Sequence, residues 1–152
     1  MYLLDTNHCS DIITGRNPNT INKLKQIPED AQIAINSIIY GELVLMVEKS
    51  QQKLKNALLL ENFIRKVRLY PLDAATAIHY GEIHAAIFDH FAPKEQAKRR
   101  KFRIQDCGMH NHDLWIAATA LQHDLTIVTD DSDFNRIREV IGAVRVESWR
   151  RS

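Results

Sequence analysis

Short apolar runs alternate with longer segments of helical periodicity along this chain. Runs rich in β-branched or aromatic residues predict strands at residues 2–4, 32–35, 68–72 and 126–129, and residues 144–146 could add a last strand. Apolar residues spaced three and four apart predict helices at residues 37–49, 51–66, 74–91 and 113–122. Asp73 is expected to cap the third of these helices, and Pro18, which follows Asn17, suits the first turn of another.

This alternation of strands and helices predicts an α/β fold, with a short, mostly parallel central sheet and helices on both of its faces. The sequence has no internal repeat and no low-complexity segment, so we expect residues 1–152 to form a single domain. The composition shifts once, in a basic insertion at about residues 93–108, where Glu95 is the one acid among the six basic side chains of residues 93–103. We expect this basic insertion to be an exposed loop or a helical extension within the domain.

Composition and charge place the chain among ordinary globular proteins. It has 152 residues, 45% of them hydrophobic, and its 20 Lys and Arg against 19 Asp and Glu give a formal net charge of +1. Two cysteines are too few for a disulfide framework, and the first residues reach Asp5 too soon for a signal peptide. No stretch approaches the length of a membrane span, so we expect a cytoplasmic protein.

Two acidic residues follow the two runs that most resemble strands. Asp5 comes directly after residues 2–4, and Asp131 comes shortly after residues 126–129, with Asp130 and Asp133 beside it. Open α/β sheets bind ligands beyond the carboxyl ends of their strands, so these acids could line a ligand site. Taken singly, each could instead be a turn residue or a helix cap.

Two further acids lie on the apolar faces of predicted helices. Glu42 is spaced three or four residues from Ile38, Ile39, Leu45 and Met46, which places its carboxylate on the stripe expected to pack against the sheet. Asp113 stands at the same helical spacing from the apolar positions that follow it, and it also lies at the start of its helix, where it could be a plain N-cap.

Four carboxylates gathered at one end of a sheet require a compensating cation, because like charges and burial both oppose ionisation. Ligands that are all oxygen select hard ions, here Mg²⁺ or Mn²⁺. Such an ion acidifies a bound water and polarises a phosphoryl oxygen. The residues therefore predict hydrolysis of a phosphodiester.

Other metal sites fit the sequence less well. Residues 131–135 resemble the start of a calcium loop, but Arg136 and Gly142 stand where that loop needs Gly and Glu. Cys107, His110 and His112 could bind zinc, although a fourth ligand is not evident, and the two histidines could instead contact RNA.

Four motifs, in order along the chain, resemble those of the PIN-domain ribonucleases. They are Leu4-Asp5-Thr6-Asn7, Ser37 with Glu42-Leu43, the run from His112 to Ala118, and the run from Ile127 to Phe134. The ending, with Phe134, Arg136-Ile137 and Val146-Glu147-Ser148-Trp149, is similar to that of the VapC-type toxins of toxin–antitoxin pairs.

This resemblance implies a three-layer α/β/α fold, endonucleolytic cleavage of RNA dependent on Mg²⁺ or Mn²⁺, homodimers, and a small antitoxin that blocks the site. It implies Asp5, Glu42 and Asp113 as core metal ligands, with Asp131 as the fourth acid and Asp133 as second choice. It implies that metal-activated water attacks the phosphorus. The side chains implied to orient these carboxylates are Thr6, Asn7 and Thr129. The segment before Asp113 departs from the family, since it lacks the usual small turn and is longer.

The basic insertion could contact RNA phosphates, be an ordinary solvated face, or dock an antitoxin. The candidate RNA-binding residues are Lys98, Arg99, Arg100, Lys101 and Arg103. A net charge near +1 is compatible with RNA cleavage, since acids gathered at a metal would leave this stretch free. Two other functions stay open: a non-catalytic RNA- or protein-binding module whose acids are helix caps, and a phosphatase or phosphotransfer domain with a carboxylate metal site.

Overall fold

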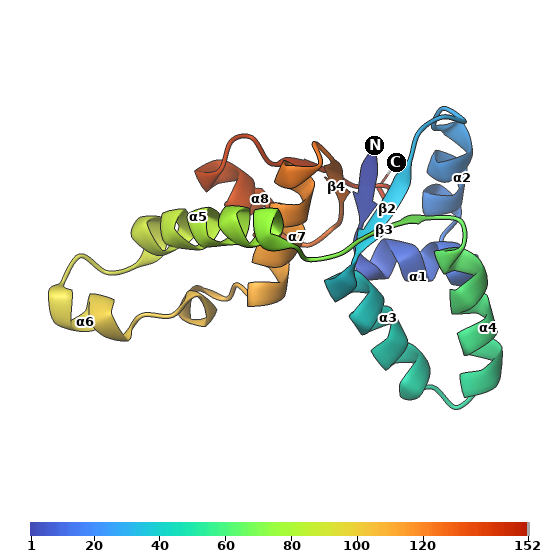
Figure 1. Ribbon diagram of the computed structural model, residues 1–152, viewed down its shortest axis with the longest axis horizontal. Helices are drawn as coiled ribbons and strands as arrows, with labels where there is room; N and C mark the ends of the chain where they lie inside the picture. Colours follow the sequence, from blue (N-terminus) through green and yellow to red (C-terminus); the bar gives the residue numbers. More distant parts are fainter. Residues whose placement is uncertain (152) are drawn as a thin grey trace.

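The computed structural model describes residues 1–151 and contains five strands and several helices, shown in Figure 1. The strands are β1 (Tyr2–Leu4), β2 (Ile33–Asn36), β3 (Arg68–Tyr70), β4 (Thr126–Val128) and β5 (Arg145–Glu147). The helices are α1 (Thr6–Thr14), α2 (Pro18–Gln26), α3 (Ser37–Glu48), α4 (Lys53–Ile64), α5 (Ala74–Phe91), α6 (Gln96–Lys101), the 3₁₀ helix η1 (Ile104–Cys107), α7 (Asn111–Gln122) and α8 (Ser132–Val140). Within residues 1–151, no helix is both long and apolar enough to cross a bilayer.

The strands form one parallel sheet in the order β3-β2-β1-β4-β5. From β1 the chain steps outward through β2 to β3, then returns to the other side of β1 for β4 and β5. Because crossovers between parallel strands are right-handed, this reversal sends the two sets of helices to opposite faces. Figure 1 shows α5, α7 and α8 on one side of the strands and α1 and α2 on the other. The predicted α/β fold with a parallel sheet covered on both faces is confirmed.

The centre of the sheet is buried on both faces, as its apolar strands require. Leu3 and Leu4 of β1 and Ile127 and Val128 of β4 are fully buried. Helix α7 packs closely here, because its small residues Ala117, Ala118 and Ala120 are also buried. Ala117 and Ala120 belong to the apolar positions predicted to follow Asp113 at helical spacing, so that face is confirmed.

The sequence did not predict helices α1 and α8, which directly follow β1 and β4. Helix α1 begins after Asp5 and α8 begins after Asp131, the two acids expected to follow strands. Asp5 caps α1, accepting the backbone N–H of His8 at 2.7 Å, and Asp131 caps α8, accepting that of Asp133 at 2.9 Å. Both acids therefore stabilise helix N-termini, which are positive ends of the helix dipole.

The basic insertion forms a projecting arm, residues 93–109, that contains α6 and η1. Figure 1 shows α6 at the end of the molecule remote from α3. The base of the arm is fixed by Arg136 of α8, whose Nη1 donates to the Cys107 carbonyl at 2.7 Å and whose guanidinium lies 4.9 Å from the ring centre of Phe91. Gly108 ends η1 with φ 84°, a left-handed conformation that favours glycine.

Candidate active site

The sheet order reverses between β1 and β4, and the candidate acids lie at this point. Chains leaving β1 and β4 turn to opposite faces, and open α/β sheets bind ligands beyond the strand ends at such a point. The backbone N–H of Asp5 donates to the Val128 carbonyl at 3.0 Å, so the ends of the two strands are in direct register. The fold therefore brings Asp5 and Asp131, which are far apart in sequence, to neighbouring strand ends.

Asp5 is almost fully buried and is bound by His8, a residue that sequence reasoning missed. The carboxylate Oδ1 of Asp5 accepts the backbone N–H of His8 and lies 2.8 Å from Nδ1 of its ring. His8 occupies the third position after the capping acid, the spacing of a capping box. A histidine at that spacing from a strand-end aspartate is the signal that could have identified it.

Glu42 lies in the middle of α3 and is half-buried, bound by side chains from two other helices. Its Oε2 accepts the hydroxyl of Thr6, and its Oε1 lies 3.0 Å from Nδ1 of His112. The prediction that Glu42 shares a stripe packed on the sheet is wrong for Leu45 and Met46, which are about half exposed, at 52% and 46%. Ile39, which belongs to the predicted stripe, is buried together with Leu43.

Asp113 lies in the first turn of α7, although it is not the cap. The helix begins at Asn111, so Asp113 is at its third position, where Oδ2 accepts the backbone N–H of His110 at 3.2 Å. Burial, and to a lesser extent the negative charges of Asp131 and Asp133, raise the pKa of Asp113 to about 6. This carboxyl group is therefore held in a site that disfavours its charge.

Three carboxylates lie close together near the start of α7 and α8. Asp113, Asp131 and Asp133 each offer an oxygen within 4.8 Å of the others. Thr129 fixes the approach to α8, because its Oγ1 accepts the backbone N–H of Asp131 at 3.0 Å, and Asp133 pairs with Arg136 at 3.2 Å. Asp5 and Glu42 are not part of this group among residues 1–151. Both are near the same end of the sheet, Asp5 as the cap of α1 and Glu42 on α3.

Other candidate residues have different surroundings. Asn7 is exposed on α1, and its backbone carbonyl, not its side chain, accepts a bond from Arg150 at 3.3 Å. The thiol of Cys107 donates to the Ile104 carbonyl at 3.0 Å while His112 faces Glu42, so the structure does not gather a zinc site there.

Some basic side chains of the arm form ion pairs and others do not. Lys98 pairs with Glu95 at 3.1 Å. Arg99 pairs with Asp89 and covers the ring of Phe88. Lys94, Arg100, Lys101 and Arg103 are exposed and form no ion pair within residues 1–151.

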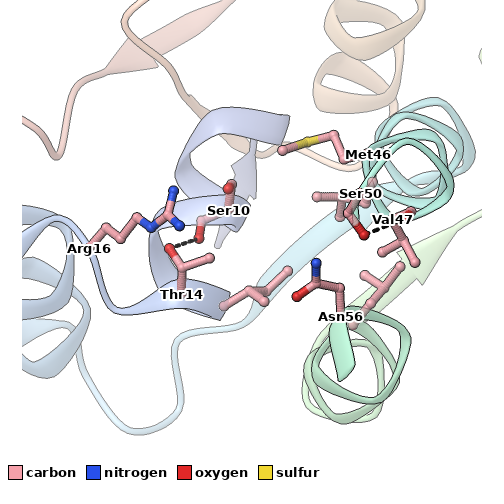
Figure 2. Close-up of a pocket in the computed structure, with 10 residues that line it drawn as sticks. Ser10, Thr14, Arg16, Met46, Val47, Ser50 and Asn56 are labelled. Atoms are coloured by element: carbon pink, nitrogen blue, oxygen red, sulfur yellow. Dashed lines mark hydrogen bonds between the residues drawn. The ribbon is translucent and has the colours of Figure 1, made fainter. Parts of the chain in front are cut away.

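A pocket adjoins α1 on the side away from the arm. Its lining comes from α1 and from the α3–α4 hairpin, and Figure 2 shows Thr14 and Arg16 facing Met46 and Asn56 across it. The acids of the strand ends do not line this pocket. It is therefore a separate surface feature of the molecule.

The fold and these acids define a protein class. The family model of the PIN domain matches residues 2–140, and the chain belongs to this family. The match spans all the acids described above and ends before β5. The resemblance found in the sequence motifs is thus confirmed at the level of the family.

Individual relatives cover nearly the whole chain. It is 29% identical over 150 residues to ribonuclease VapC2 of Rickettsia felis, covering 98% of each, and 28% identical to the tRNA(fMet)-specific endonuclease VapC of Shigella flexneri, covering 97% of each. It is also similar to the structure of VapBC2 from Rickettsia felis bound to a promoter DNA fragment, with a TM-score of 0.75, 27% identity and coverage of 97% of this chain and 98% of that one. The DNA-bound VapBC of Salmonella typhimurium gives a TM-score of 0.74, 26% identity and 97% coverage of each chain.

Proposed function

We propose that this protein is a metal-dependent endoribonuclease that hydrolyses RNA phosphodiester bonds and acts as the toxin of a toxin–antitoxin pair. The observation that carries the proposal is the group of Asp113, Asp131 and Asp133, whose oxygens lie within 4.8 Å of one another at the point where the strand order reverses. The relatives named as ribonucleases or endonucleases match along nearly their whole length, which supports the same activity here.

The donor set fits a hard divalent cation, Mg²⁺ or Mn²⁺, because every candidate ligand is a carboxylate. Asp113 is disfavoured as an anion by burial and by its acidic neighbours, and a cation would reverse that penalty. The residues that would hold the metal are Asp5, Glu42, Asp113 and Asp131, with Asp133 as second choice. Asp133 ranks lower because it is already paired with Arg136.

When bound, a divalent cation supplies an acidified water and polarises the phosphoryl oxygen. The protein's part is to hold the carboxylates in fixed orientations. Thr6 donates to Glu42, and Thr129 accepts from the backbone of Asp131, so both restrict the acids beside them. Asn7 would help to orient these carboxylates through its exposed side chain. No nucleophilic side chain is required.

The arm would provide affinity for the RNA backbone. Arg100, Lys101 and Arg103 are exposed, and basic side chains of this kind bind phosphate without reading sequence. Lys98 and Arg99, which are paired with neighbouring acids, would contribute less. Because α6 lies at the far end of the molecule from α3, an RNA held by both the arm and the acids must extend along the protein.

A small antitoxin is the expected protein partner, as in the similar VapBC complexes. The α3–α4 hairpin offers an apolar surface for it, since large side chains are exposed there: Val44, Leu45, Met46, Leu54 and Leu58. Cleavage of cellular RNA would take place in the cytoplasm. The homodimer implied by the resemblance stays a prediction.

A second candidate is a non-catalytic module, and one observation favours it. Asp5 and Asp131 do cap helices, which is a sufficient structural reason for an acid at either position. Capping alone does not explain Asp113, which is held at a cost to its charged form.

Cleavage of structured RNAs by the purified protein tests the proposal. Reactions would contain Mg²⁺, Mn²⁺ or EDTA, beside an Asp113→Asn variant purified in the same way. We expect defined fragments with either metal, and none in EDTA or with the variant. Cleavage that persists in EDTA or in the variant would refute the metal-dependent mechanism, and an inactive parent would favour the non-catalytic module.

A further inference from the structure

His8 is fully buried against the carboxylate of Asp5, and both of its donors reach the same oxygen. Its backbone N–H donates to Asp5 Oδ1 at 2.7 Å, and its ring Nδ1 lies 2.8 Å from that atom. The first bond is an ordinary helix cap, which many residue types could supply. The second requires a ring nitrogen at this position.

The other ring nitrogen fixes the tautomer of His8. Nε2 lies 3.4 Å from the backbone N–H of Trp149, which can only donate a hydrogen bond. Nε2 is therefore the acceptor in this contact, and Nδ1 is the nitrogen that donates to Asp5. Asp130 Oδ2 is the nearest acid to Nε2, at 4.0 Å, too far for a hydrogen bond.

The segment that presents this backbone N–H is firmly held. Trp149 is buried and packs edge to face on Tyr2, with ring centres 5.2 Å apart. Arg150, the next residue, donates to both oxygens of Asp11, at 2.7 and 3.0 Å. A bidentate pair of this kind restricts both side chains and fixes the chain between them.

We propose that His8 is a positioning residue for Asp5, linking the orientation of that carboxylate to the segment around Trp149. With Oδ1 engaged by two N–H groups of His8, Oδ2 is left as the oxygen that can meet a divalent cation. Groups that orient a ligand carboxylate in this way alter metal affinity without touching the metal. The proposal rests on the proposed function, since it assigns Asp5 to a metal site.

Titration with Mn²⁺, following the paramagnetic resonance signal of the free ion, tests this role without measuring activity. His8→Leu removes the ring donor and should weaken Mn²⁺ binding by about 10-fold to 100-fold. His8→Asn retains an N–H at the place of Nδ1 and should bind nearly as the parent does. Phe63→Leu, a buried substitution on α4, controls for general loss of stability. Equal Mn²⁺ affinity in parent and His8→Leu, or equal weakening in Phe63→Leu, would overturn the proposal.

Nitrogen NMR of the histidine rings in the parent provides a readout that does not depend on any variant folding. We expect the tautomer of His8 with its proton on Nδ1; a proton on Nε2 would overturn the proposal. Failure of the two proposals can be told apart. A parent that binds no Mn²⁺ refutes the proposed metal site, and with it the role of His8, whereas a parent that binds and an unaffected His8→Leu refute only the role of His8.

Discussion

The side-chain amide of Asn36 donates to the hydroxyl of Thr119 at 2.9 Å, in the buried space between the start of α3 and the middle of α7. The amide oxygen of Asn36 also caps α3, accepting the backbone N–H of Ile39 at 3.0 Å. One buried pair thus joins the helix that carries Glu42 to the helix that carries Asp113. It adds to the contact between His112 and Glu42, which joins the same two helices.

Thr119→Val should destabilise the protein by about 1–3 kcal/mol, because it leaves the buried amide of Asn36 without an acceptor. Thr119→Ser keeps the hydroxyl, so its free energy of unfolding should decrease by clearly less than that of Thr119→Val. Urea unfolding followed by circular dichroism measures both. Equal losses in the two variants would mean that the hydrogen bond contributes nothing beyond packing.

Asp113 should make the metal-free protein less stable as pH rises. Its pKa is about 6 in the folded protein, against 3.8 for an ordinary aspartate, so the folded state binds the proton more tightly than the unfolded state does. The stabilisation associated with the protonated form is therefore full below pH 3.8 and lost by about pH 6.

Asp113→Asn removes this titration while keeping an oxygen for the backbone N–H of His110. In EDTA, the free energy of unfolding of the variant minus that of the parent should increase as the pH passes through that range and level off above it. Denaturant unfolding at a series of pH values measures the difference. A difference that is constant with pH would show that the pKa of Asp113 is not raised.

Asp131 and Asp133 should differ in their effect on cleavage. Asp131→Asn should reduce the metal-dependent rate more strongly than Asp133→Asn, because Arg136 already engages the Asp133 carboxylate. Single-turnover cleavage at several Mn²⁺ concentrations compares the two variants with the parent. The reverse order would make Asp133 the fourth ligand.

The exposed basic residues of the arm should control the salt dependence of RNA binding. Replacing Arg100, Lys101 and Arg103 with Gln, in the Asp113→Asn background to prevent cleavage, should weaken binding. The slope of log K against log salt concentration is negative, and its magnitude should decrease by about 0.7–0.9 for each RNA phosphate that the variant no longer neutralises. Replacing Lys23, Lys25 and Lys55, which are exposed outside the arm, is the matched control. An unchanged slope in the arm variant would contradict its role in RNA binding.

The sequence predicted the elements whose signal is local. The strands at residues 2–4 and 126–129 are apolar and β-rich, and the helix around Asp113 shows clear periodicity, so all three were found with errors of at most two residues. Helix α1 could not be found in this way. Residues 6–10, Thr-Asn-His-Cys-Ser, form helices poorly on their own, and the helix depends on the cap from Asp5 and on packing.

The surroundings of the acids were harder to predict than their presence. Periodicity grouped Leu45 and Met46 with Glu42, but it cannot tell a face covered by the sheet from one left exposed. His8 meets Trp149 across 141 positions of sequence, and Asp11 meets Arg150 across 139. Such pairs form only when the sheet brings distant segments together, so a single sequence carries no signal for them.

Anomalous diffraction from crystals grown with Mn²⁺ is the sharpest test of the proposed metal site, because it locates the metal among the acids. We expect a peak at the carboxyl ends of β1 and β4, coordinated by Asp113 and Asp131 together with Asp5 or Glu42, and no peak there in Asp113→Asn crystals. A parent crystal with no peak at these residues, or with Mn²⁺ bound only elsewhere, would contradict a metal site formed by these acids.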